Sequence, residues 1–137
     1  NVSMTTIHLQ GGIEMIAAAN EAKANTKILG VSLLTSLDES DTQMLYNNNF
    51  NNQFNNLINV AEKSEVDGIV CSSMELALLS DSNLIKVVPG IRNLKQIDDQ
   101  KRVMTSKEAY ENGASYIVVG RPITQANNIE EAIKEYS

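Results

Sequence analysis

Two arginines follow short apolar runs, and they are the residues best suited to bind a ligand. Arg92 comes directly after VVPGI (residues 87–91), and Arg121 comes directly after YIVVG (residues 116–120). Gly120 follows a predicted buried strand, where a ligand can approach main-chain N–H groups that bind an oxyanion. The guanidinium of Arg121 adds a planar fork suited to phosphate. The alternative is that Arg121 only extends over the rim of the fold with its charged end in water.

The loop that follows residues 87–91 favours the interpretation that Arg121 binds an anion. Arg92 begins this loop and Gln100 lies within it. Both side chains carry hydrogen-bond donors that could reach an anion bound near Arg121. Such a loop could also fold over a phosphate and exclude water from it. The two segments together predict an anion-binding site.

These candidate residues belong to an alternation of predicted strands and helices. Five runs are short, apolar and rich in β-branched residues, which is typical of parallel strands covered by helices. They are TTIHL (residues 5–9), ILGVSLL (residues 28–34), GIVC (residues 68–71), IKVV (residues 85–88) and YIVV (residues 116–119). The sequence therefore predicts an α/β fold. Periodicity alone fits both an open flavodoxin-like sheet and a piece of a larger barrel.

The asparagine-rich stretch YNNNFNNQFNN (residues 46–56) is predicted to be helical. Its apolar residues continue beyond the stretch on one helical face, which favours a helix with a solvated polar side over a disordered tract. These residues are Phe50, Phe54, Leu57, Ile58 and Ala61.

Three more helices are predicted from their boundaries and their apolar faces. Gly11 and Gly12 precede a helix that carries Ile13, Ile16, Ala17 and Ala19. Thr105, with Glu108 three residues later, predicts a capped helix start, and Gly113 predicts its end. The last amphipathic helix carries Ile129, Ala132, Ile133 and Tyr136.

Composition limits the classes of function. The chain has 137 residues, 42% of them hydrophobic, which is enough for a single domain over residues 1–137 with a real core. Its net charge of −6 and scattered basic residues argue against partners such as nucleic acid or an anionic membrane. One cysteine excludes an internal disulfide and favours a reducing cytoplasm. The sequence contains neither a membrane-spanning apolar stretch nor a signal-peptide pattern.

Ligands of parallel α/β proteins bind at the carboxyl ends of the strands, which selects a short list of candidates. They are His8, Gln10, Thr35, Ser36, Ser72, Ser73, residues 89–92 and residues 120–122. Two arginines among small hydroxyl and glycine residues again indicate an anion site.

Other residues that could do chemistry have simpler interpretations. His8 has no second histidine and no cysteine at ligand spacing, so we expect a hydrogen-bonded side chain and no metal. Cys71 ends a predicted strand and is expected to be packed, without a partner for nucleophilic catalysis. The acidic run LDESD (residues 37–41) is expected to be a solvated loop and helix cap. There is no Walker A loop, no G-x-G-x-x-G and no H-E-x-x-H motif.

Six segments, in order, resemble bacterial orotidine 5′-phosphate (OMP) decarboxylase, the enzyme that makes UMP by removing CO₂ from OMP. They are HLQGG (residues 8–12), LLTSLDESD (residues 33–41), VDGIVCSSME (residues 66–75), VVPGIR (residues 87–92), DDQKRVMT (residues 98–105) and GASYIVVGRPIT (residues 113–124). The similarity covers essentially the whole chain. Its most specific part is PGIR, followed by DQ-x-R and then GRPIT.

This resemblance implies a TIM-type (β/α)8 barrel, of which the chain would supply strands four to eight. By position, Thr35 would hydrogen-bond the pyrimidine edge, and Arg92 would lie at the base of a phosphate loop. Gln100 would bind the phosphate from that loop, and Gly120 and Arg121 would bind it beyond strand eight. The family pattern also implies a homodimer with active sites at the subunit interface and no cofactor.

The chain departs from the family in its catalytic centre. The signature D-x-K-x-x-D is absent, as are the acidic and lysine residues expected of the first two strands. None of the lysines present is well placed to replace them; Lys27 and Lys86, for example, lie toward the amino ends of their strands. We therefore expect a fragment that cannot decarboxylate OMP alone. Its expected partner is a missing amino-terminal half or a second copy of the chain.

Two alternatives remain beside a fragment of a pyrimidine-biosynthesis enzyme. One is a relative in the same barrel superfamily that decarboxylates or condenses sugar phosphates, against which DDQKR and PGIR argue. The other is a non-catalytic phosphate-binding or assembly module derived from the same barrel.

Overall fold

The strands form one parallel sheet in which strand order follows chain order. The computed structural model describes residues 2–93 and 104–137. The strands are β1 (Met4–His8), β2 (Lys27–Val31), β3 (Gly68–Val70), β4 (Ile85–Val88) and β5 (Tyr116–Ile117), paired in the order β1-β2-β3-β4-β5. A flavodoxin-like sheet has the order 2-1-3-4-5, so this sheet is not of that kind. Sequential parallel order is that of a (β/α)8 barrel.

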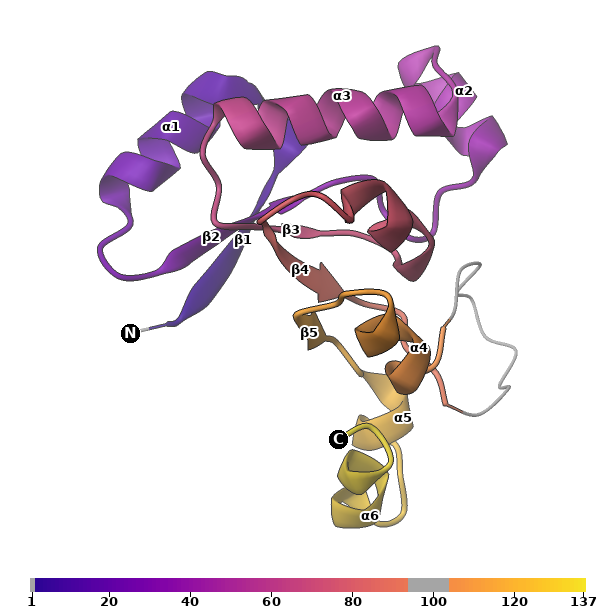
Figure 1. Cartoon of the computed structure of the whole chain (residues 1–137). Helices are drawn as coiled ribbons and strands as arrows, with labels where there is room; N and C mark the ends of the chain where they lie inside the picture. Colours follow the sequence, from indigo (N-terminus) through magenta and orange to yellow (C-terminus); the bar gives the residue numbers. More distant parts are fainter. Residues whose placement is uncertain (1, 94–103) are drawn as a thin grey trace.

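The connections between the strands are helical. The α-helices are α1 (Gly12–Ala22), α2 (Glu39–Tyr46), α3 (Phe50–Lys63), α4 (Ser106–Glu111), α5 (Arg121–Thr124) and α6 (Ile129–Lys134). Two 3₁₀ segments, η1 (Leu9–Gly11) and η2 (Ser73–Leu79), follow β1 and β3. Helices α1 and α3 lie side by side across β1, β2 and β3 (Figure 1). Helices α4, α5 and α6 gather near β5. In the described ranges, no helix is both long and apolar enough to cross a membrane.

All five predicted strands are present, but most are shorter than predicted. The strand predicted over residues 28–34 runs from Lys27 to Val31, and the one predicted over 116–119 has only two residues. Apolar residues therefore continue past the ends of the strands. Leu33 is such a residue: it lies beyond β2 and is buried in the core cluster.

The asparagine-rich stretch contains a break between two helices, which the sequence did not predict. Asn47 ends α2 with a left-handed φ of 50°, a conformation that asparagine tolerates better than most residues. The Asn49 side chain then caps α3 by accepting a hydrogen bond of 2.8 Å from the N–H of Asn52. Beyond this break the predicted apolar face is confirmed, since Phe54, Leu57 and Ala61 are buried. Asn47 and Asn49 thus form the boundary between α2 and α3.

The edge strands are more exposed than the centre of the sheet. Three consecutive residues of β2 are buried, whereas in β1 Thr5, Thr6 and His8 are exposed. At the other edge, Tyr116 and Val118 are about half exposed. In the part of the chain that the structure describes, β1 pairs with β2 alone and β5 pairs with β4 alone.

The helices at the two ends of the chain bury less of their apolar surface than the sequence predicts. Helix α1 buries Ile16, but Ile13 and Ala17 are exposed. Near the carboxyl terminus, Ala132 and Tyr136 are buried as predicted, while Ile129 and Ile133 are 51% and 47% exposed. The periodicity located these helices correctly but did not show that part of each apolar face lacks a neighbour among the described residues.

At the amino edge of the sheet, Asp67 ties several elements together. Its carboxylate accepts hydrogen bonds from Lys23 Nζ and from the N–H of Ile28, and its main-chain oxygen accepts the N–H of Ile85. Burial alone would raise the pKa of Asp67, but the bonds from Lys23 and Ile28 outweigh it and hold the pKa below its ordinary value. The ionised carboxylate is therefore the form that the fold prefers.

We expect Asp67→Asn to lower the free energy of unfolding by about 1 kcal/mol at neutral pH, because the charged hydrogen bonds are lost. A lowered folded-state pKa stabilises the fold above the unfolded-state pKa of about 4, and this contribution disappears as the pH falls through the folded-state value. Urea titrations at pH 7 and pH 3 measure the difference. The exposed Asp81, changed to asparagine, is the control. A difference between wild type and Asp67→Asn that is equally large at both pH values would contradict this account.

Candidate functional site

The pairing of β4 with β5 brings the two predicted phosphate-binding segments to the same edge of the sheet. The strands are parallel, with Val88 alongside Ile117, and the N–H of Val118 donates to the oxygen of Val88 over 2.8 Å. Arg92 follows β4 by four residues, and Gly120 follows β5 by three. Both loops leave the carboxyl ends of neighbouring strands, where ligands of parallel α/β folds bind.

Arg92 is held by its main chain. Gly90 makes the turn after β4 with a φ of 77°, a conformation that glycine adopts without steric cost. Ile91 then forms a parallel bridge with Met104, and the N–H of Arg92 donates to the oxygen of Met104 over 3.0 Å. The guanidinium Nη1 donates back to the oxygen of Ile91, so the half-buried side chain folds over its own loop.

Gly120 and Arg121 form the turn from β5 into α5. The oxygen of Gly120 accepts the N–H groups of Ile123 and Thr124, which begins the helix. Pro122 fits the first turn because an N–H there has no partner within the helix. A Cβ built on Gly120 would meet no atom of the described residues within 4 Å, so among these residues the space beside this main chain is open. The half-buried Arg121 starts the helix beside that space.

Thr35 lies on the loop after β2, in a different part of the same edge. It is half-buried and lines a cavity of about 70 Å³ to which Pro89, on the segment leading to Arg92, also contributes. The remaining lining residues are Val31, Leu33, Leu34, Val70 and Cys71. The cavity therefore connects the carboxyl ends of β2, β3 and β4. Gln100, the fifth predicted site residue, lies outside the described residues, as do Asp98 and Asp99.

His8 and Gln10 form a separate hydrogen-bonded group near β1. Nδ1 of the exposed His8 lies 3.3 Å from Oε1 of Gln10, and Nε2 of Gln10 donates to the oxygen of Ser32 and to the Tyr46 hydroxyl. The prediction of a hydrogen-bonded histidine is confirmed. In the described ranges, no group of three His, Cys, Asp and Glu side chains is placed to hold a metal ion.

Cys71 is packed, as predicted, and is 1% exposed. Burial, with the neighbouring Glu75 carboxylate, raises the pKa of the Cys71 thiol to about 12. At neutral pH the side chain is therefore an unreactive thiol.

Glu75 is a buried residue that the sequence reasoning missed. Its carboxylate accepts hydrogen bonds from the N–H and the hydroxyl of Ser72, over 2.7 Å and 2.8 Å. The pattern Ser72-x-x-Glu75 is a capping box, which is visible in the sequence and predicts the start of a helix at this position. Its role is to start η2.

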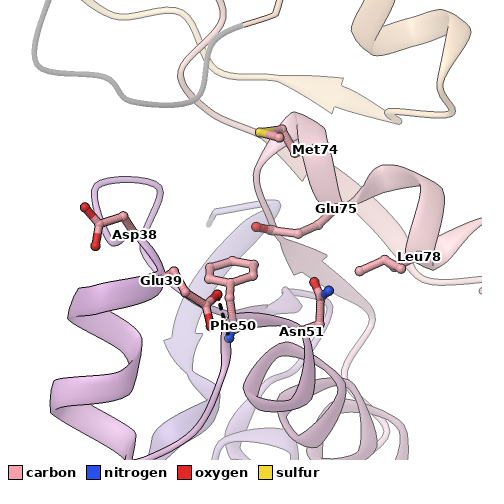
Figure 2. Close-up of a pocket in the computed structure, with 7 residues that line it drawn as sticks. All are labelled: Asp38, Glu39, Phe50, Asn51, Met74, Glu75 and Leu78. Atoms are coloured by element: carbon pink, nitrogen blue, oxygen red, sulfur yellow. Dashed lines mark hydrogen bonds between the residues drawn. The ribbon is translucent and has the colours of Figure 1, made fainter.

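A pocket of about 290 Å³ lies between the starts of α2, α3 and η2 (Figure 2). Three carboxylates line it, and each has a structural role. Asp38 caps α2, as the sequence predicted for the acidic run, by accepting the N–H of Asp41. Glu39 accepts the N–H of Phe50, which starts α3. Glu75 caps η2. Because helix capping accounts for these charges, we place the candidate site at the ends of β4 and β5 and not in this pocket.

Comparison with known proteins agrees with this architecture. The profile described as "Orotidine 5'-phosphate decarboxylase / HUMPS family" matches residues 1–136. The chain belongs to this family. An orotidine 5'-phosphate decarboxylase of Aquifex aeolicus is 44% identical over 140 residues, covering 95% of this chain and 61% of the relative. One of Streptococcus sanguinis is 39% identical over 142 residues, covering 98% and 61%.

Solved structures extend the family likeness to the fold. The crystal structure of the orotidine 5'-phosphate decarboxylase from Lactobacillus acidophilus matches with a TM-score of 0.77 and 32% identity, over 98% of this chain and 63% of that one. The decarboxylase from Pyrococcus horikoshii matches with a TM-score of 0.72 and 23% identity, over 98% and 59%, and supports the fold alone. The chain thus spans about three fifths of the length of the family members it matches.

Proposed function

We propose that residues 1–137 form a single domain that is the carboxyl-terminal portion of an OMP decarboxylase barrel, strands four to eight with their helices. In this proposal Arg92, Gln100, Gly120 and Arg121 bind the phosphate of OMP or UMP. Thr35 hydrogen-bonds the pyrimidine edge. The parent enzyme is a cofactor-free lyase of pyrimidine biosynthesis.

The observation that carries the proposal is the meeting of two arginine-bearing loops at the carboxyl ends of paired parallel strands. An anion placed in the space before Gly120 would meet the main-chain N–H groups of Gly120 and Arg121 and the guanidinium of Arg121. Arg92, from the neighbouring loop, would add a second cation. Two guanidinium groups and a carboxamide suit the several oxygens of a phosphate monoester.

We also propose that this chain lacks the groups that decarboxylation needs. Loss of CO₂ from the pyrimidine leaves negative charge on carbon, which requires a cation and a proton donor beside it. The described lysines lie elsewhere: Lys86 donates to the oxygen of Ser82, and Lys23 pairs with Asp67 at the amino edge. Lys95 and Lys101 lie outside the described residues. With no D-x-K-x-x-D in the sequence, we propose that this chain binds the nucleotide and is inactive alone.

The exposed edges of the sheet support the proposal that another polypeptide packs against this chain. Unpaired strand edges are normally covered in native proteins, and among the described residues β1 and β5 each have one unpaired edge. We propose that a missing amino-terminal half or a second copy of the chain covers them, and that the working parent enzyme is a homodimer. A reducing cytoplasm suits the single thiol, Cys71.

Purified chain mixed with OMP is expected to show no turnover above the uncatalysed rate, because the catalytic carboxylates and lysine are absent. The loss of OMP absorbance measures this directly. The decarboxylase from Lactobacillus acidophilus serves as the positive control. Turnover that persists after a second purification of the chain would refute the proposed inactivity.

Calorimetry with UMP and with inorganic phosphate tests the binding site. We expect Arg121→Ala to weaken UMP binding about tenfold or more, because a charge-assisted, bidentate contact is lost. Lys107→Ala, which removes an exposed cation on α4, is the control and should leave the affinity unchanged. Tight UMP binding would indicate a completed nucleotide pocket. Weak binding, equalled by phosphate, would indicate the phosphate-binding module alone. Equal affinities of the wild type and Arg121→Ala would contradict the proposed site.

Sedimentation velocity tests the role of the edges. We expect the isolated chain to self-associate, and Thr6→Lys to shift it toward the monomer, because a lysine on an exposed edge strand opposes pairing with another chain. Asn55→Lys, on the exposed face of α3, is the matched control and should not change association. A wild-type chain that remains monomeric at every concentration would rule out association between copies.

A further inference from the structure

Asn93, the residue after Arg92, joins three segments that are far apart in the sequence. Its Oδ1 accepts the N–H of Ser106 over 2.8 Å, and its Nδ2 donates to the Ser106 hydroxyl over 3.1 Å. Nδ2 also donates to the main-chain oxygen of Glu135, and the N–H of Asn93 donates to the Tyr136 hydroxyl over 3.3 Å. One amide thus links the loop after β4 to the start of α4 and to the end of the chain.

The partners of Asn93 are themselves well anchored. Ser106 and Tyr136 are only 8% and 7% exposed, and Tyr136 belongs to the hydrophobic core cluster. The amide of Asn93 uses both of its donor hydrogens and its acceptor oxygen in these contacts. Breaking a hydrogen bond to a buried group leaves that group unpaired. This costs more free energy than breaking a hydrogen bond to an exposed group.

The contacts fix the main chain on both sides of Arg92. On the amino side, the Ile91–Met104 bridge and the bond from Arg92 N–H to Met104 hold the chain to the segment before α4. On the carboxyl side, the side chain of Asn93 is bonded to Ser106, the first residue of α4. The main chain of Arg92 is therefore held in place, and its side chain extends from a fixed position at the carboxyl edge of the sheet.

We propose that Asn93 is a positioning residue for the phosphate site: it holds Arg92 at the edge from which Gly120 and Arg121 also leave. This inference rests on the proposed function, since Arg92 has a ligand to position only if the site binds phosphate. The Tyr136 hydroxyl contributes to this positioning by accepting the N–H of Asn93. Residues at the end of the chain thereby act on a phosphate-binding arginine more than 40 positions earlier.

Two variants separate positioning from general stability. Asn93→Ala removes all the side-chain contacts, and Tyr136→Phe removes one hydroxyl while keeping the buried ring. Asn55→Ala, an exposed asparagine on α3, is the matched control. If Asn93→Ala does not fold, Tyr136→Phe still tests whether the hydrogen bond from the Asn93 main-chain N–H helps to hold the Arg92 segment.

The readouts are amide hydrogen exchange by NMR and the dissociation constant for inorganic phosphate. Asn93→Ala is expected to weaken phosphate binding about tenfold and to speed exchange of the Arg92 amide by a similar factor; Tyr136→Phe is expected to do both by about threefold. Exchange at Leu57, in the core on α3, should stay unchanged in both variants. The control should match the wild type throughout.

Each outcome decides the proposal. If exchange at Arg92 and Leu57 rises together, Asn93 only stabilises the fold and the proposal is wrong. If the wild type binds phosphate and neither the affinity nor Arg92 exchange changes in the variants, it is also wrong. If the wild type does not bind phosphate, the proposed function fails by itself. Exchange at Arg92 then still shows whether Asn93 holds this segment.

Discussion

The arrangement of the candidate site depends on the parallel pairing of β4 with β5. This contact is short, since β5 has two residues and the N–H of Val118 extends the ladder by one bond. Parallel pairing forces both strands to end at the same edge, so the loops that carry Arg92 and Arg121 leave side by side. A sheet with another order would separate segments that are almost 30 positions apart in the chain.

The two ends of each strand have different roles. At the amino edge, the ionised carboxylate of Asp67 joins β2 to Lys23, at the end of α1, and the main-chain oxygen of Asp67 binds β4. Lys86 donates there to the oxygen of Ser82. At the carboxyl edge lie the arginines, Gly120 and Thr35, which are the residues that we propose bind the ligand. This division is usual in parallel α/β folds, where one edge stabilises and the other binds. Lys23 and Lys86 therefore lie at the opposite edge of the sheet from the candidate site.

The burial of side chains decreases from the central strands of the sheet to its edges, which supports the proposal of a partial barrel. The central strands are packed, while β1 and β5 leave side chains and main-chain groups uncovered among the described residues. The exposed Ile13, Ile129 and Ile133 lie on helices toward the same two ends of the chain. In a closed barrel every strand has two neighbours, and these surfaces would be covered.

The sequence by itself determined the local features. The five strands, the face of α3, the Thr105–Glu108 capping box and the packing of Cys71 all follow from neighbouring residues, because periodicity and capping are local interactions. The residues alone left the sheet order open, and only the resemblance of whole segments favoured a barrel. The tertiary structure decided that order, since strand pairing is a contact between distant segments. It also decided which isoleucines of α1 and α6 are exposed, and it revealed the contacts of Asn93 with Ser106 and Tyr136. No spacing in the sequence predicts those contacts, because the fold alone brings the three segments together.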